Sequence, residues 1–210
     1  MGGLSSPLFF YWMESIGMSN ISLSRLPAVQ REDLDEEGKQ AYDTVGDPNH
    51  RLWAKLMGPP AFWLHIPELL VPIREINWRI RRKMDALEPR LRELTVLVTA
   101  RAHDCQYEWT AHEPYSLNAG LDPAIVDVVK HRKPVTGLGE KEAAIITFGR
   151  ELFREHKVSD DTYNRALRAL GEKGVVQMVA LMSNYAMTAT ILLAIGQRLR
   201  PEQSPLLPLD

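Results

Sequence analysis

Apolar residues recur at intervals of three and four along much of this chain, which is the period of an amphipathic α-helix. The pattern is clear over 140–155, where Ala143, Ile146, Phe148 and Leu152 would face a core. No run of alternating apolar and polar residues marks a set of strands. The pattern therefore predicts an all-α fold of about seven or eight helices. The other expected helical segments are 33–45, a turn at 51–57, 71–84, 88–103, 104–118, a helix from 123, 159–170 and 174–196.

Capping residues and breakers set the expected ends of these helices. Asp122 and Ser159 are typical N-caps, and Gly120 and Gly171 are typical C-terminal stops. Two prolines, at 67 and 72, interrupt the apolar segment 62–84. We expect its regular helix to begin near residue 71, because proline disrupts a helix interior. Beyond that point the apolar positions recur at Ile73, Ile76, Ile80 and Met84.

Two apolar segments allow more than one interpretation. The run LTVLVTA is rich in β-branched residues and could form a buried strand, but its length and Pro89 at a first helical turn favour a buried helix. Residues 174–196 carry no charge and are long enough to span a bilayer. Interspersed polar residues such as Asn184 favour a core or subunit-interface helix instead.

The chain has 210 residues, which fits one domain of ordinary globular composition. We expect a helical domain over 19–200, a flexible N-terminal extension over 1–18 and a C-terminal tail over 201–210. The single cysteine cannot form an intrachain disulfide, which favours a reducing cytoplasm.

The charge distribution gives no case for a nucleic-acid partner. The net charge is −2, so no basic excess is present to neutralise phosphates. The short basic run Arg79, Arg81, Arg82, Lys83 is interpreted as a solvated helix end. We expect neither a nucleic-acid nor a membrane partner.

A thiol, a carboxylate and an imidazole follow one another closely in the middle of the chain. Cys105, Glu108 and His112 are spaced i, i+3 and i+7, so they would share one face of a helix. Tyr107 and Trp109 flank them and could wall a pocket. A thiol beside an imidazole can form a reactive thiolate, and a carboxylate beside an imidazole can orient it.

Glu93, on the preceding helix, is the fourth candidate. A buried carboxylate needs a hydrogen-bond donor, and His112 is an obvious one. Each candidate also has a structural interpretation without function. Cys105 could be an inert buried thiol, Glu108 and His112 could form a surface pair, and Glu93 could lie on the solvated face of its helix. His103 adds a further possible ligand, but no zinc-site spacing is present. We expect no metal and no cofactor.

The strings RELTVLV, CQYEWTAH and AGLDPAIV, with the later YAMTATILLAIG, resemble the carboxymuconolactone decarboxylase family. This family also contains the alkylhydroperoxidase D-like proteins, and the resemblance covers roughly residues 35–200. It implies a helical fold built around a helical hairpin. It also implies a homo-oligomer, often a trimer or hexamer, with pockets near the subunit contacts.

The resemblance extends to single residues. In the alkylhydroperoxidase D-like branch, a glutamate precedes a C-x-x-C pair and a histidine; Glu93, Cys105 and His112 match the glutamate, the first cysteine and the histidine. Glu108 stands where that branch has its second, attacking cysteine. The chain therefore cannot cycle an internal disulfide, and CQYEWTAH looks more like the non-redox part of the family.

These observations favour a cofactor-independent lyase that decarboxylates a small carboxylated or lactone-type compound, as in aromatic-acid breakdown. His112 would donate a proton, Glu93 would orient it, and Glu108 would be a second acid–base group. Cys105 would line the pocket, and Arg101 would hold the substrate carboxylate. Two alternatives remain: a redox protein in which peroxide oxidises Cys105 and an external thiol reduces it, and a helical assembly module without catalysis.

Overall fold

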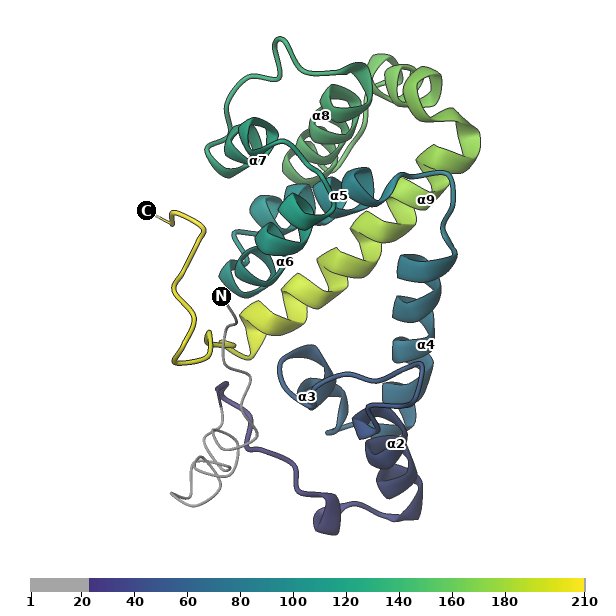
Figure 1. Ribbon diagram of the computed structural model, residues 1–210, viewed down its shortest axis with the longest axis vertical. Coiled ribbons are helices and arrows are strands. Elements are labelled where there is room, and N and C mark those ends of the chain that lie inside the picture. The colour runs from purple at the N-terminus through teal and green to yellow at the C-terminus, as the bar shows by residue number, and fades with distance from the viewer. Residues whose placement is uncertain (1–22, 210) are drawn as a thin grey trace, which may run out of the picture.

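A computed structural model of the chain describes residues 23–209, which form eight α-helices and no strand (Figure 1). The expected all-α fold is confirmed, whereas the extension predicted over 1–18 lies outside the described residues. The elements are η2 (Arg31–Asp33), α2 (Glu36–Gly46), α3 (Pro59–Trp63), α4 (Pro67–Lys83), α5 (Pro89–Ala102), α6 (Gln106–Asn118), α7 (Pro123–Lys130), α8 (Glu140–Glu155) and α9 (Asp160–Ala194).

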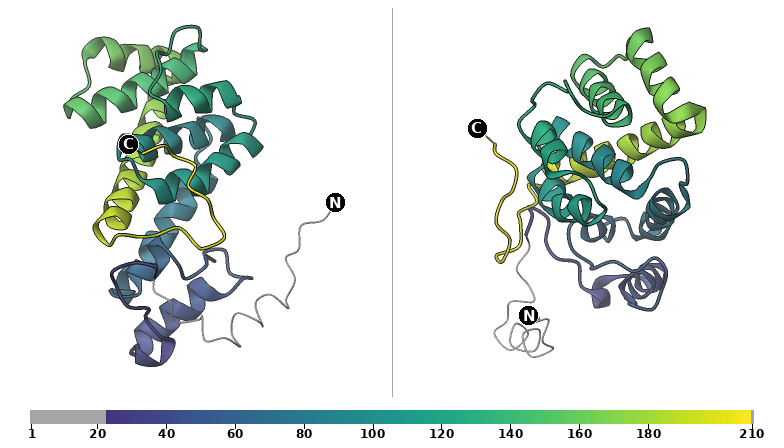
Figure 2. Two further views of the ribbon diagram at one scale, coloured as in Figure 1. Left: turned by 90° about the vertical axis from the view of Figure 1, so that its left-hand side faces the viewer. Right: turned by 45° about the horizontal axis from the view of Figure 1, so that its top comes forward.

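The helices form two groups joined by α9. Helices α2, α3 and α4 lie at one end of the molecule, and α5 to α8 lie at the other, in all three views (Figures 1 and 2). Helix α5 packs against α6, α7, α8 and α9, so it is the centre of the larger group. This position explains its sequence: the run LTVLVTA is helical and buried on nearly every side. The alternative of a buried strand is therefore wrong.

Each group has its own apolar core. The larger core contains Leu94, Leu97, Trp109, Ile145 and Met178, all fully buried. A smaller cluster from α2, α3 and α4 contains Ala41, Val45, Leu64 and Leu70. The tail that follows α9 adds to the larger core, because Leu207 is buried in it.

The capping residues act as expected. The Asp122 carboxylate accepts a hydrogen bond of 2.8 Å from the Ala124 amide, and the Ser159 hydroxyl accepts one of 3.3 Å from the Thr162 amide. Gly171 has φ +70° and breaks the helical path of α9 into two segments. Glycine adopts this backbone conformation without the clash that a Cβ would cause. The predicted helices on either side of residue 171 are thus both present.

Three details near α4 correct the sequence prediction. Helix α4 begins at Pro67 rather than near 71, because proline fits a first helical position, and Pro72 is accommodated inside the helix. The turn expected over 51–57 is not helical, since Arg74 binds the carbonyls of Leu52 and Trp53 there. Ile76, expected in the apolar stripe, is 47% exposed.

Helix α9 is long and apolar enough to cross a membrane, by length and composition alone. Half of its most apolar window is buried inside the protein, including Met178, Leu181 and Met182. Such burial is typical of a core helix, in agreement with the interpretation made from the sequence.

Candidate functional site

The candidate site lies where α4, α5, α6 and α9 meet. Helix α5 supplies Glu93, α6 supplies Glu108 and His112, α4 supplies Arg81, and α9 supplies Tyr185. The spacing of Glu108 and His112 on one helix puts both side chains on the same face. Both are buried, at 5% and 6% exposed.

His112 stands between two carboxylates. Its Nδ1 lies 2.8 Å from Glu93 Oε2, and its Nε2 lies 3.6 Å from Glu108 Oε2. The first contact is a hydrogen bond, whereas the second is an ion-pair distance that a small rotation of either side chain would shorten. The Tyr185 ring stands edge-on to the imidazole, at 5.1 Å between ring centroids. The contact between Glu93 and His112 expected from the sequence is therefore present.

Arg81 completes the arrangement on the outer side of Glu93. Its Nη2 donates a hydrogen bond of 2.9 Å to Glu93 Oε1, and its Nη1 donates one of 2.8 Å to the Tyr185 hydroxyl. The basic run at the end of α4 is exposed, as the sequence interpretation expected, but that interpretation did not foresee the contacts of Arg81 with Glu93 and Tyr185. The spacing of Arg81 carried a signal, because Arg74, Asn77 and Arg81 are i, i+3 and i+7 and form a polar stripe on one face of α4.

The two carboxyl groups have pKa values displaced in opposite directions. Burial raises the pKa of Glu108, and the positive charges of His112 and Arg81 only partly offset this effect. Burial also acts to raise the pKa of Glu93. There, however, the hydrogen bond and charge of His112, together with the charge of Arg81, hold the value below its usual range. Titratable groups separated in this way are typical of acid and base partners in active sites.

A cavity of about 240 Å³ opens beside Glu108 and His112. A wider cavity of about 560 Å³ lies on the Glu93 side, and both are lined by Arg74, Asn77, Arg81 and Tyr185. The amide oxygens of Asn77 and Asn184, which line the smaller cavity, have no hydrogen-bond partner among residues 23–209. Buried polar atoms of this kind are available to bind a polar ligand.

Cys105 is set apart from this cavity. It is the N-cap of α6 rather than a residue of the helix, so it leaves the helical face that Glu108 and His112 share. It is 1% exposed and packs against Ala189 and Leu192. Burial raises the pKa of the thiol to about 11. The thiol at this position is protonated at neutral pH.

The remaining predicted site residues do not line this smaller cavity. Trp109 is fully buried in the larger core, where its Nε1 donates to Glu113. Tyr107 packs beside Cys105. Arg101 donates to the Lys130 carbonyl at 2.8 Å and pairs with Asp104. Arg101 therefore does not contact the Glu93–His112 pair.

Within the part of the chain that the structure describes, no group of three or more His, Cys, Asp or Glu side chains is arranged to hold a metal ion. The groups placed to bind a ligand are the guanidinium groups of Arg74 and Arg81 and the amides of Asn77 and Asn184.

Solved structures place the fold among the alkylhydroperoxidase D-like helical proteins. The core of a peroxidase-related alkylhydroperoxidase AhpD protein from Ralstonia eutropha is similar, with a TM-score of 0.69, 17% identity, and coverage of 87% of this chain and 95% of that one. The debrominase Bmp8 is similar with a TM-score of 0.63, 13% identity, and coverage of 83% and 91%. A putative antioxidant defence protein AhpD from Agrobacterium tumefaciens follows with a TM-score of 0.60, 14% identity, and coverage of 67% and 97%.

Residues 67–147 match the model of the carboxymuconolactone decarboxylase family. The matched segment contains Arg81, Glu93, Cys105, Glu108 and His112. The resemblance drawn from the sequence is thereby confirmed for this segment. No curated protein sequence matches the chain.

Proposed function

We propose that the protein is a cofactor-independent lyase that removes carbon dioxide from a small carboxylated or lactone-type compound. The observation that carries this proposal is the position of His112, held by Glu93 on one side and facing Glu108 on the other at a cavity wall. Acid–base chemistry needs a proton held close to the reacting atom in a site with little water.

Substrate binding rests on the polar stripe of α4. Arg74 and Arg81 give the cavity positive charge, which attracts an anionic compound. Asn77 and Asn184 offer amide groups to its hydroxyl or carbonyl oxygens. A cavity of about 240 Å³ suits a compound of one small ring.

The chemical step breaks the bond between the substrate carbon and its carboxylate. Carbon dioxide leaves, and the electron pair stays on the carbon, delocalised into the adjoining unsaturated system. Arg81 lies beside this charge and stabilises it. His112 delivers a proton from Nε2 to the carbon, and Glu108, whose raised pKa favours its protonated form, returns a proton to the ring.

The redox alternative has less support. A thiol reacts as its thiolate, and Cys105 is buried with a pKa raised to about 11. The peroxidase-related description belongs to a neighbour that shares the fold at 17% identity. We therefore place the lyase first.

The test is to incubate the protein with a panel of small unsaturated carboxylated lactones and β-keto acids in deuterium oxide. Proton NMR should show one deuterium at the carbon that lost carbon dioxide. His112→Gln and Glu108→Gln should each lower the rate by about 10²- to 10⁴-fold, as expected for loss of an acid–base group. His103→Gln and Glu113→Gln are matched controls, because neither side chain lines the smaller cavity.

Turnover that is equal in wild type and His112→Gln would contradict the proposal. So would a panel from which the protein releases no carbon dioxide above the uncatalysed rate. Circular dichroism of each variant shows whether a lost rate reflects chemistry or unfolding.

A further inference from the structure

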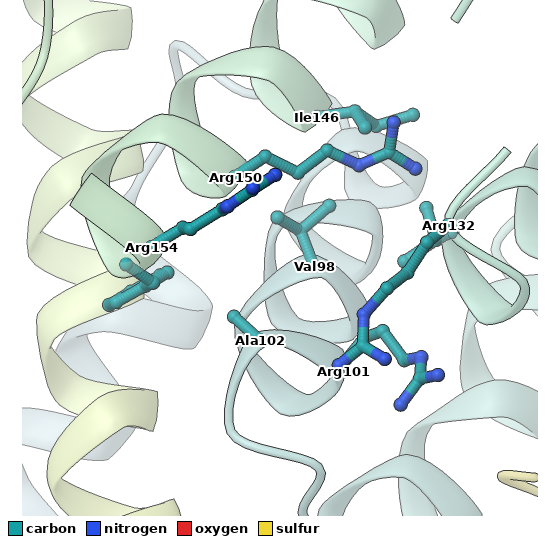
Figure 3. A pocket seen from close by; sticks show the side chains of 9 residues that line it. Val98, Arg101, Ala102, Arg132, Ile146, Arg150 and Arg154 are labelled. Carbon is teal, nitrogen blue, oxygen red and sulfur yellow. The ribbon is translucent and has the colours of Figure 1, made fainter. Parts of the chain in front are cut away.

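A second cavity, here called the basic cavity, lies at the C-terminal ends of α5, α7 and α8, apart from His112. Its volume is about 540 Å³ (Figure 3). It is lined by Val98, Arg101, Ala102, Val129, Arg132, Ile146, Arg150, Phe153 and Arg154. None of these residues lines either cavity of the candidate active site.

The floor of the basic cavity is apolar and firmly packed. Val98, Val129 and Ile146 are buried, and all three belong to the larger core. Gly149 lies directly against Val98, so α5 and α8 approach closely beneath the cavity. A floor made of core residues keeps its shape when a ligand binds, which limits the cost of reorganisation.

Four guanidinium groups surround this floor. Figure 3 shows Arg150 and Arg154 on one side of Val98 and Ala102, and Arg101 and Arg132 on the other side. The one carboxylate bonded to any of the four, among residues 23–209, is that of Asp104, which pairs with both Arg101 and Arg132. The rim therefore carries a clear excess of positive charge.

Hydrogen bonds to carbonyls at the C-terminal end of α7 and in the loop that follows it explain part of this arrangement. Arg150 donates to the carbonyls of Lys133 and Val128, and Arg101 donates to that of Lys130. Carbonyls at helix C-termini favour nearby cations. These bonds use only some of the five N–H donors of each guanidinium, and they hold the groups in place.

Hydrogen bonds of this kind do not explain the position of Arg154. Its side chain is exposed and makes no hydrogen bond or ion pair with residues 23–209. Like-charged groups gathered without acids repel one another, and an anion between them would relieve that repulsion. Guanidinium groups are also suited to binding a carboxylate through two parallel hydrogen bonds.

We propose that the basic cavity binds a small organic anion whose carboxylate lies between the arginines and whose flat apolar body covers Val98, Ile146 and Phe153. The site is separate from the candidate active site, so it is a second ligand site on the protein. Its ligand class is an aromatic or short aliphatic carboxylate.

The test uses two substitutions at Ala102, which is exposed in the middle of the cavity floor. Ala102→Glu places a carboxylate among the arginines, whereas Ala102→Gln is its neutral match in size. The probe is 8-anilinonaphthalene-1-sulfonate, an aromatic anion, titrated against the full chain by calorimetry with 2-naphthoate as competitor. Ala102→Glu should weaken binding by about ten-fold or more, because an anionic competitor occupies the donors, and Ala102→Gln should stay within about three-fold of wild type.

Further variants and a neutral probe test whether binding depends on the positive charge of this cavity. Arg150→Gln with Arg154→Gln should weaken the probe, whereas Arg31→Gln with Arg165→Gln, which removes the same charge elsewhere, should not. Neutral N-phenyl-1-naphthylamine should bind more weakly than the anion.

Equal affinity in Ala102→Glu and Ala102→Gln would overturn the proposal. So would displacement of the probe by inorganic phosphate as readily as by 2-naphthoate at one ionic strength. An Ala102→Glu variant that changes sedimentation rather than probe affinity would instead identify a contact between copies of the chain, and would also overturn it.

Discussion

Glu93 and Glu108 both approach the His112 ring, yet their surroundings favour opposite protonation states. Glu93 has a hydrogen-bonded imidazole and a guanidinium, so its ionised form is favoured. Glu108 is buried, and the charges of His112 and Arg81 only partly offset the effect of that burial on its pKa, so its neutral form is favoured. One ring thus separates a carboxylate that holds it in place from a carboxyl group whose pKa is raised by burial.

Glu108→Gln is expected to change the pH dependence of stability. The folded pKa of Glu108 is raised, so its contribution is most favourable at low pH and is lost as pH rises from the ordinary glutamate value through the folded one. The variant lacks this loss. Its free energy of unfolding relative to wild type should therefore increase with pH, as measured by urea unfolding between pH 4 and pH 8. A difference that is constant with pH would contradict the raised pKa.

Glu93→Gln should show the opposite trend. The lowered pKa of Glu93 gives stability that is present above the ordinary glutamate value and is lost as pH falls through the folded one. At neutral pH the variant should lose about 1.5–3 kcal/mol, the range for a hydrogen bond to a charged group. The loss should shrink in acid. Parallel trends for the two glutamine variants would show that their pKa values are not separated.

Cys105 should react slowly with iodoacetamide in the native protein. Its thiol is buried and its pKa is raised to about 11, so little thiolate is present between pH 6 and pH 9. The rate should rise many-fold in urea, where the side chain is exposed. His112→Ala should leave the native rate unchanged, because Cys105 makes its contacts with Ala189 and Leu192 instead. Fast native alkylation would restore the redox alternative.

Among the helices, the contact between α5 and α8 depends on Gly149, which has no side chain to push the two helices apart. A Cβ at Gly149 would clash with Val98 Cγ1. Gly149→Ala should therefore lower the free energy of unfolding by about 1–3 kcal/mol, as overpacking does in a dense core. Gly46→Ala is the control, since its Cβ would make an ordinary contact of 3.5 Å with Leu56. Thermal unfolding of both variants checks this, and equal midpoints would contradict it.

The helices were predictable where local chemistry decides them. Asp122, Ser159 and Gly171 mark helix ends through their own side chains or backbone freedom, and these ends appear as expected. Helix α4 was misjudged because a proline interior to a helix is tolerated when packing compensates, which no local pattern reports. Cys105 was placed on the helix of His112, although it precedes the first helical residue.

At the scale of the whole molecule, the site joins residues that are far apart along the chain. Arg81 and Tyr185 are separated by 104 positions, and their contact depends on how α4 and α9 cross. Sequence patterns specify helices better than the angles between them, so Tyr185 was missed. Glu93 and His112 were paired correctly because both belong to one hairpin, α5 and α6, and because the family resemblance named them.

The homo-oligomer implied by the family resemblance remains a prediction. Apolar side chains such as Ile76, Val176 and Leu193 are exposed on one chain and offer surface for such contacts. Sedimentation equilibrium should give three or six times the chain mass of 23.9 kDa. A single-chain mass at micromolar concentration would contradict the prediction.

The two nitrogens of His112 face two carboxyl groups that line different cavities. Nδ1 meets Glu93, which lines the wider one, and Nε2 faces Glu108, which lines the smaller one. In the proposed reaction, each decarboxylation consumes a proton that His112 Nε2 supplies inside the smaller cavity. Nδ1 already carries the hydrogen that it donates to Glu93, so the ring regains its proton at Nε2, from Glu108. Glu108 lines the same cavity as the bound compound, so solvent reprotonates it after the product has left, and product release sets the moment of proton uptake in each turnover.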